Sequence, residues 1–269
     1  MAHHYHSRYH FSYAVSAKHH FFTSIGLIAF LLILVLFVLH WAVPVRLVDL
    51  QKLSFIDIVV ASLATLYRLT IAYLLALVVV VPLAIFTTAH PKIEKILLPI
   101  FDILQSVPAL AFFPIIVLVF IKLSLFDFAA IFVLFMAMLW NLVFSMIGGL
   151  KAIPAEIHAT AQVFGAKGFK ALRLVTLPAI FPYIVTGSLL AWGSSWTIII
   201  VAEVLHNYIP GSSPSQDLFG LGSLLVDAAY QNNNLQFLAA LVAMILVISV
   251  MNFFIWQKLL RLAERFKFD

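Results

Sequence analysis

The sequence predicts an all-α fold, a polytopic membrane bundle of six transmembrane helices. The first reason is composition: of the 269 residues, 64% are hydrophobic and 10% are charged, whereas soluble domains are about 45–50% apolar and about 25% charged. The second is that six runs, nearly all without charge, reach the length of about 20 apolar residues that a helix needs to cross a bilayer. The core of a soluble domain of this length would not need so much apolar surface, so a soluble protein is excluded.

The six predicted spans follow one another along the chain. The first, Phe21–Val45, is a true span, because its apolar core is too long for a cleaved signal peptide and no small-residue cleavage pattern follows it. The other five are Leu69–Ala89, Ile103–Ile121, Phe128–Leu150, Leu174–Ala202 and Phe237–Trp256. Several of them contain Pro or Gly, which membrane helices tolerate where neighbouring groups satisfy the freed backbone.

Lys and Arg are distributed unevenly over this topology. Twelve of the 16 basic residues fall before the first span, between spans two and three, between spans four and five, or after the sixth. Loops on the cytoplasmic side carry an excess of Lys and Arg. The bias therefore predicts that both termini are cytoplasmic, and it explains the formal charge of +5 without nucleic-acid binding.

Four segments are predicted. Residues 1–20 form a tail with six of the ten histidines, for which a metal-binding role and a simple solvated tail both stay open. Residues 21–61 hold the first span and an outer loop, 62–260 a membrane domain with five spans, and 261–269 a cytoplasmic tail. The outer loop before the last span contains "GLGSLLVDAA", which predicts a short helix at the membrane face. The chain has no Cys, so disulfides and thiolate chemistry are excluded.

The polar loop 151–177 between the fourth and fifth spans is the most informative stretch. Its part "PAEIHATAQVFGAKGFKALRLVTLP", Pro154–Pro178, predicts two short helices. Pro154 suits a helix start and Glu156 complements the helix dipole there. Ile153, Ile157, Ala161 and Phe164 recur at helical spacing and predict one apolar face, and Gly165 and Gly168 predict a tight turn. That apolar face could lie on lipid or insert into a groove of a soluble partner.

This loop resembles the cytoplasmic EAA loop of ABC-importer permeases, E-A-A-x3-G-x9-I-x-L-P. Gly165 matches the glycine, and Val175, Leu177 and Pro178 match the end. Ala159, Thr160 and Ala161 stand where Glu-Ala-Ala is expected. Three further stretches are similar to the nitrate/sulfonate/taurine/bicarbonate branch: 62–85, "LLPIFDILQSVPALAFFPIIVL", and "LPAIFPYIVTGSLLAWGSSWTIIIVAEVL". "GLG" at 220–222 also recurs there, and the similarity covers roughly 62–260.

The resemblance implies a type I ABC importer permease in the bacterial inner membrane, which forms the translocation path for a small solute, with nitrate, sulfonate and bicarbonate as candidate anions. It implies as partners a second permease copy, with a homodimer favoured, two cytoplasmic ATPases and an extracytoplasmic binding protein. ATP and Mg would belong to the ATPases, because this chain has no G-x-x-x-x-G-K-[ST] motif. The chain itself is then not an enzyme and needs no cofactor or metal.

Two groups of site residues are predicted. Those expected to couple the loop to an ATPase are Glu156, Ile157, Ala159, Thr160, Ala161, Phe164, Gly165, Ala166, Lys167, Leu177 and Pro178. Polar residues inside spans are candidates for the path, with helix–helix hydrogen bonding as the alternative. For Glu203 the alternatives are a position in the water on the outer side or pairing with Arg68. The path candidates are Gln105, Ser106, Asn141, Ser145, Ser194, Ser195, Trp196 and Glu203.

A second hypothesis is a channel or secondary transporter subunit without an ATPase partner. Such proteins commonly bury ionisable groups at depth or carry inverted repeats. Here the predicted spans hold almost no charge at depth, and no repeat is evident. A membrane enzyme is less well supported, because no His, Asp and Glu constellation gathers on one membrane face.

Overall fold

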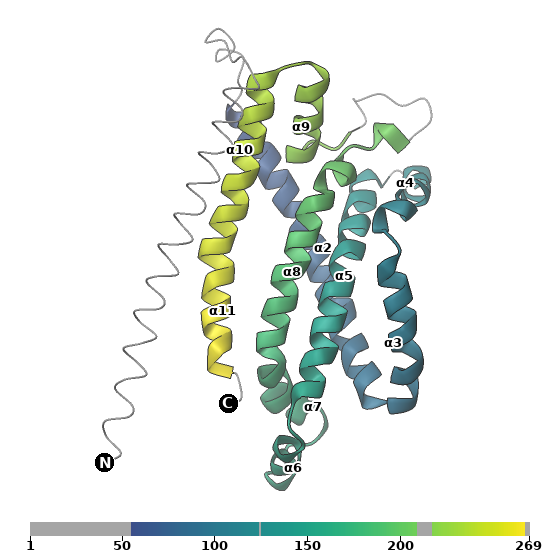
Figure 1. Ribbon diagram of the computed structural model, residues 1–269, viewed down its shortest axis with the longest axis vertical. Coiled ribbons are helices and arrows are strands. Elements are labelled where there is room, and N and C mark those ends of the chain that lie inside the picture. Colours follow the sequence, from purple (N-terminus) through teal and green to yellow (C-terminus); the bar gives the residue numbers. More distant parts are fainter. Residues whose placement is uncertain (1–54, 124, 209–216, 267–269) are drawn as a thin grey trace, which may run out of the picture. The chain divides into compact units, whose positions relative to one another are not determined.

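The computed structural model describes residues 55–123, 125–208 and 217–266, which form helices and connecting turns without a strand (Figure 1). All of them belong to the larger of two units, Ser54–Asp269. The predicted first span Phe21–Val45, the His-rich segment and the last three residues lie outside the described residues, so the prediction of six spans stays a prediction for its first member.

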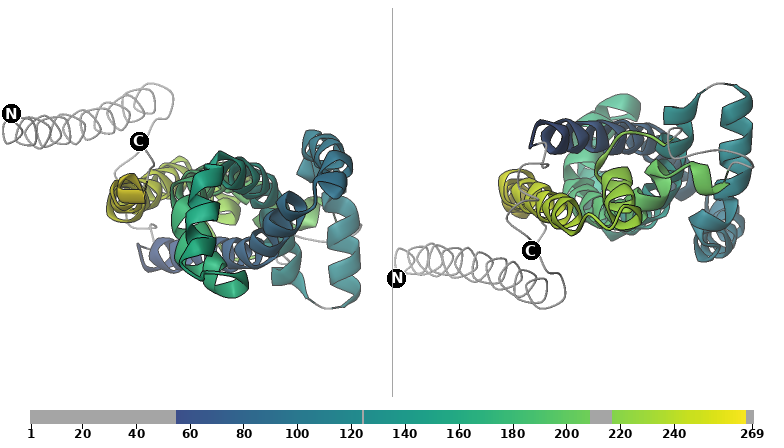
Figure 2. Two further views of the ribbon diagram at one scale, coloured as in Figure 1. Left: turned by 90° about the horizontal axis from the view of Figure 1, so that it is seen from below. Right: turned by 90° about the horizontal axis from the view of Figure 1, so that it is seen from above.

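Three long helices form the core of the described unit: α2 (Phe55–Ala89), α5 (Phe126–Ala152) and α8 (Leu177–Glu203). Helix α5 packs between the other two (Figures 1 and 2), and its buried side chains include Leu134, Met138, Leu142 and Met146. Small residues help the helices approach: a Cβ on Gly187 of α8 would lie 2.6 Å from the Ser145 Cβ on α5. This use of glycine is typical of helix contacts in membranes.

Four helical stretches of the described residues are long and apolar enough to cross a membrane: Phe55–Ala89, Phe126–Ala152, Gly168–Glu203 and Asn234–Phe266. They confirm four of the predicted spans, with shifted ends. The largest shift is in α2, which begins 14 residues before the predicted Leu69. Arg68 directly precedes the predicted span, but it lies inside α2 and is buried, because its charge is paired within the unit, as described below.

The predicted straight span Ile103–Ile121 is wrong as one helix. Helix α3 (Pro91–Ser106) and the segment Ala109–Phe120 meet at a 78° bend, with a 3₁₀ turn η2 (Ala109–Phe112) leading into α4 (Phe113–Lys122). The reason is Pro108, which disfavours the helical conformation for the residue before it. Val107 accordingly has φ −79° and ψ 121°, an extended backbone. The bent pair is either one broken span or a re-entrant hairpin.

The remaining elements cover the two ends of the three-helix core. At one end, η4 (His206–Tyr208) and α9 (Leu221–Tyr230) precede α10 (Asn234–Met251), and α9 confirms the short helix predicted for this loop. A π-helical turn η6 (Asn252–Trp256), α11 (Gln257–Ala263) and a 3₁₀ turn η7 (Glu264–Phe266) continue α10 to the other end of the bundle, where α6 (Ala155–Val163) and α7 (Gly168–Ala171) also lie (Figure 1).

Candidate functional site

The loop between α5 and α8 folds as the two short helices that the sequence predicts. Pro154 precedes α6 and Glu156 lies in its first turn. Helix α6 ends in a Schellman motif: the Gly165 N–H donates to the Gln162 carbonyl at 3.0 Å and the Ala166 N–H to the Ala161 carbonyl at 2.9 Å. Gly165 has φ +73°, a left-handed conformation that glycine adopts without a steric penalty. The predicted tight turn is therefore confirmed.

Helix α7 leads without a break into α8. Gly168 begins α7 with φ +53°, and a π-helical turn η3 (Leu172–Thr176) joins α7 to Leu177 at the start of α8. The segment Gly168–Glu203 is therefore continuous and 36 residues long.

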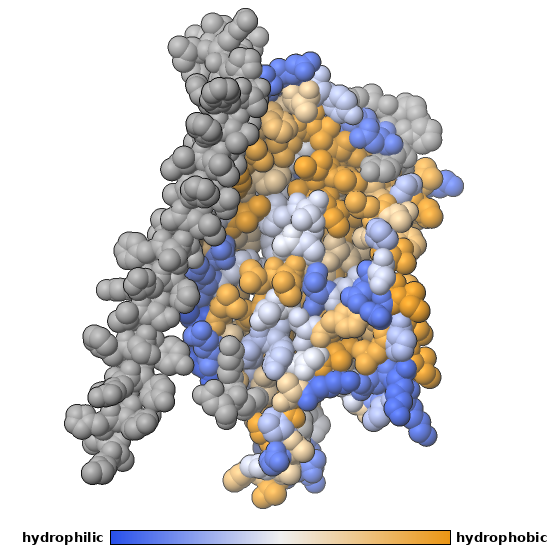
Figure 3. Space-filling model, viewed as in Figure 1, coloured by the Kyte–Doolittle hydropathy of each residue, from blue (hydrophilic) through white to orange (hydrophobic). Residues whose placement is uncertain are grey.

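The apolar residues of this loop divide into two sets rather than forming the single predicted face. Ile157 packs against the buried residues Ile153 and Ile180, and Ala161 and Ala166 are also buried. In contrast, Val163, Phe164 and Phe169 are 83%, 80% and 76% exposed. We call these three residues and the two glycines between them the α6 turn. Figure 3 shows its apolar surface at the tip of the bundle, where α6 lies in Figure 1.

The other predicted coupling residues lie around this turn. Glu156, Ala159, Thr160 and Lys167 are exposed, while Leu177 and Pro178 are partly buried at the start of α8. Exposed apolar side chains next to charged ones are typical of surfaces that bind another protein.

A buried polar cluster lies at the opposite end of the bundle. Glu203, the last residue of α8, is 0% exposed. It accepts hydrogen bonds from the Thr65 hydroxyl at 2.7 Å, the Arg68 Nη1 at 2.9 Å and the Gly222 N–H at 2.7 Å. Arg68 also donates to Asp127 at 2.8 Å and to the Phe219 carbonyl at 3.0 Å. We call these side chains, Thr65, Arg68, Asp127 and Glu203, the Arg68 network.

The Arg68 network holds the first turn of α9. The first N–H groups of a helix have no partner within the helix, and its N-terminus favours negative charge. Here the Leu221 N–H donates to the Thr65 hydroxyl at 2.9 Å and the Gly222 N–H to Glu203. A Cβ on Gly220 would clash with the Glu203 carboxylate, and one on Gly222 would lie 2.8 Å from the Ile199 carbonyl. Glycine is thus required at both positions because the start of α9 lies too close to Glu203 and Ile199 for a side chain. This contact explains the two glycines of "GLG".

The polar residues predicted for the path fall into separate groups. Gln105 and Ser106 are exposed at the end of α3, where both donate to Asp102. Asn141 donates to the Ser194 hydroxyl at 2.9 Å and joins α5 to α8, the helix–helix hydrogen bond that was the alternative reading, and Ser145 lies against Gly187.

The other predicted path residues lie on α8. Ser195 is buried and its hydroxyl lacks a hydrogen bond among the described residues, and Trp196 packs on the core. Glu203 lies in the Arg68 network, with Arg68 as the partner that the sequence offered as an alternative. The assignment of these residues to a path stays a prediction.

Thr65 and Asp127 are not among the site residues predicted from the sequence. A signal for Thr65 exists: it precedes Arg68 by one helical turn, on the same face of α2. For Asp127 there is only its charge next to an apolar run.

Comparison with known proteins places these features in a family. The sequence profile of the family described as binding-protein-dependent transport system inner membrane component matches residues 80–262. The chain therefore belongs to this family of ABC transporter permeases, and it is a multi-pass membrane protein.

Individual relatives agree with this assignment. The chain is 31% identical to a nitrate import permease protein of Leptolyngbya laminosa over 189 residues, which is 70% of this chain and 63% of the relative. It is 30% identical to a bicarbonate transport system permease protein of Synechococcus elongatus over 64% of this chain and 57% of the relative. A taurine transport system permease protein of Escherichia coli is 28% identical over 53% of this chain and 50% of the relative. The chain thus covers less than two thirds of each of these relatives.

Proposed function

We propose that this chain is the permease subunit of an ATP-driven importer, forms the path for a small solute, and is driven by a separate ATPase that binds the α6 turn. The observation that carries the proposal is the exposure of Val163, Phe164 and Phe169 on a rigid turn. Covering a large apolar side chain contributes about 1.5–3 kcal/mol. A turn fixed by a Schellman motif presents these side chains at little cost in conformational entropy.

The rest of the assembly follows from the family. A second copy of the permease, two cytoplasmic ATPases carrying ATP and Mg, and an extracytoplasmic binding protein complete the importer, and the α6 turn faces the cytoplasm. The names of the relatives support a small anion such as nitrate, bicarbonate or a sulfonate as the solute. In the rival hypothesis, a channel or secondary transporter, the α6 turn only rests on lipid.

The test is co-purification of the partner ATPase, together with its substrate-stimulated hydrolysis, for three variants side by side. Gly165→Asp adds an unpaired charge at the centre of the contact and a side chain at positive φ, so we expect docking to weaken a hundredfold or more, by analogy with buried charges that lose their partner. Phe164→Ala removes one apolar side chain and should weaken docking less. Lys170→Ala should have the smallest effect, because charges at the rim contribute little.

The spans are unchanged in these variants, so each should still insert and dimerise. Wild-type co-purification and hydrolysis for Gly165→Asp would refute the coupling role and favour the rival hypothesis.

A further inference from the structure

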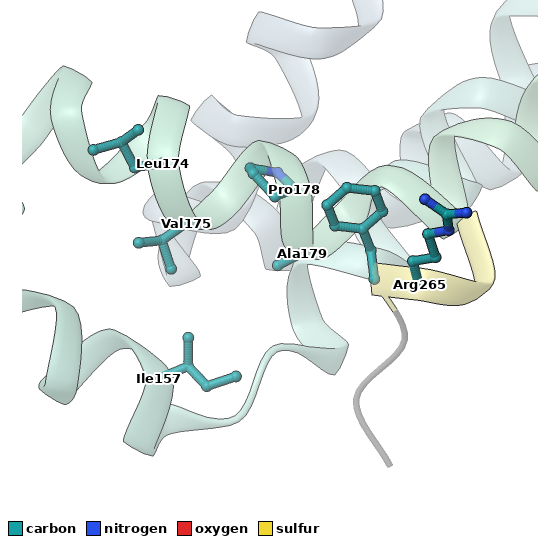
Figure 4. Close-up of a pocket in the computed structure, with 7 residues that line it drawn as sticks. Ile157, Leu174, Val175, Pro178, Ala179 and Arg265 are labelled. Atoms are coloured by element: carbon teal, nitrogen blue, oxygen red, sulfur yellow. The ribbon is translucent and has the colours of Figure 1, made fainter. Parts of the chain in front are cut away.

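A cavity of about 400 Å³ lies between α6, η3, the start of α8 and η7 (Figure 4). Its volume is within the range of small-ligand sites, about 300–1,000 Å³. Ile157 of α6, Leu174 and Val175 of η3, and Pro178 of α8 supply apolar walls, and the C-terminal turn η7 supplies Arg265 and Phe266.

The wall formed by η7 is fixed by a specific contact. The ring of Phe266 packs edge-on against the ring of Phe181 in α8, with 5.4 Å between the ring centroids. Figure 4 shows Arg265 at the end of the cavity farthest from Leu174, and Ile157 across from Val175 and Pro178. The cavity is therefore apolar along most of its length and has a cation at one end.

The charge around the cavity is strongly positive. Residues 154–178 and 257–266 together hold six basic and two acidic residues. Arg265 is exposed, and no carboxylate of the described residues lies within ion-pair distance of it. A guanidinium binds a phosphate through two parallel hydrogen bonds. The ligand that matches an apolar cavity with a guanidinium at one end is an anionic amphiphile. At the ends of membrane spans, the abundant anionic amphiphile is an anionic phospholipid.

We propose that this cavity binds an acyl chain of an anionic phospholipid, with the phosphate held by Arg265. Because Ile157 forms one wall, the bound lipid also packs against α6 and reduces its motion. The site therefore connects the lipid composition of the membrane to the order of the helix that presents the α6 turn.

The binding test uses the full chain in detergent, with lipid binding counted by native mass spectrometry during titration with dioleoyl phosphatidylglycerol. Dioleoyl phosphatidylcholine and oleate are titrated separately as a zwitterionic lipid and a free fatty acid. We expect phosphatidylglycerol to bind most tightly. Arg265→Gln should weaken it about fivefold, since one basic residue near a membrane surface contributes about 1 kcal/mol toward anionic lipid. Arg261→Gln, which removes the same charge outside the cavity lining, should leave binding unchanged.

A second variant tests the cavity itself. Val175→Phe places a larger side chain in the cavity and should remove the saturable binding of phosphatidylglycerol. Hydrogen exchange in residues 155–163 should slow on addition of phosphatidylglycerol in the wild type and not in Arg265→Gln. Both measurements are made without an ATPase, so they stand apart from the test of the proposed function.

Three outcomes would overturn the site. Equal losses for Arg265→Gln and Arg261→Gln would mean general surface attraction. Oleate binding as tightly as phosphatidylglycerol would mean a fatty-acid site. Unchanged binding in Val175→Phe, with the elution volume and unfolding temperature of the wild type, would mean that lipid binds elsewhere.

Discussion

The two ends of the described bundle use polar and apolar residues in opposite ways. At the α9 end, the Arg68 network buries the charged side chains of Arg68 and Glu203, which pair with each other, while Asp127 pairs with Arg68 from an exposed position. At the α6 end, three large apolar side chains are left exposed on a turn that is itself well ordered by hydrogen bonds. The difference shows where each end obtains its stabilisation: the charges at the first end are paired among the described residues, whereas the second end has apolar side chains that no described residue covers.

The largest expected effect comes from breaking the α9 end. Glu203→Leu leaves the buried Arg68 guanidinium without its main partner, and removal of one member of a buried ion pair costs about 3–5 kcal/mol. We expect this loss in the free energy of unfolding, measured by denaturation of the detergent-purified chain. The double variant Arg68→Met with Glu203→Leu should recover most of it, because no buried charge is then left unpaired and Asp127, which loses Arg68, is exposed. A double variant as unstable as the single one would contradict this account.

A smaller effect should follow from crowding the same end. In Gly222→Ala the new Cβ would lie 2.8 Å from the Ile199 carbonyl and 2.9 Å from the Glu203 carboxylate. Overpacking of this kind costs about 1–3 kcal/mol. Gly193→Ala in α8 is the matched control, since a Cβ there meets no described atom within 4 Å. The unfolding temperature should fall for Gly222→Ala alone. Equal decreases for both variants would show that crowding at the start of α9 does not cause the loss of stability.

The α6 end should respond weakly in stability but clearly in docking. Gly165→Ala forces a side chain to adopt φ +73°, with no other atom within 4 Å, and costs about 1–2 kcal/mol from backbone strain alone. Because this strain is local, we expect the loop to open locally more often, without global unfolding. Limited proteolysis should therefore cut the variant faster within 155–171, while its overall unfolding temperature stays within a few degrees of the wild type. Gly148→Ala, also free of contacts, serves as the control without positive φ.

The smallest expected effect is a pH dependence at the α9 end. Burial raises the pKa of the Asp227 carboxyl above its ordinary value, the charge of Asp217 raises it further, and His206 opposes both. The folded chain therefore binds this proton more strongly than the unfolded chain. Stability from this group is fully present below the ordinary pKa of about 4 and is lost as pH rises through the raised value.

Asp227→Asn should remove this decrease. The measurement is the unfolding temperature between pH 4 and pH 7. As the pH rises over this range, the unfolding temperature should fall less for the variant than for the wild type. Asp102→Asn in α3 is the control at an exposed carboxylate. An identical pH profile for wild type and Asp227→Asn would contradict the assigned cause.

How far the sequence predicts this molecule depends on how local each signal is. Four of the six apolar runs and the Gly165 turn depend on neighbouring residues, and the described residues confirm them. The start of α2 was misplaced because the charge of Arg68 is neutralised by Glu203, 135 positions away, and no local pattern contains that partner. The bend at Pro108 does not follow from the presence of a proline alone, because Pro82 and Pro182 lie inside continuous helices. Phe164 shares its helical spacing with Ile157 and Ala161 but is 80% exposed, a difference that the spacing does not predict.

The continuous segment Gly168–Glu203 gives the bundle a mechanical property. Its 36 residues extend over about 54 Å at about 1.5 Å per residue, and they start in the α6 turn and end on the carboxylate that holds α9. Because the helix is continuous, a tilt of its Gly168 end can displace its Glu203 end without any break in the hydrogen bonds of the helix. The π-helical turn Leu172–Thr176, next to the point where a load would be applied, is the place where this segment can flex. If an ATPase binds the α6 turn as proposed, a displacement of Phe169 is expected to move Glu203 and with it the first turn of α9.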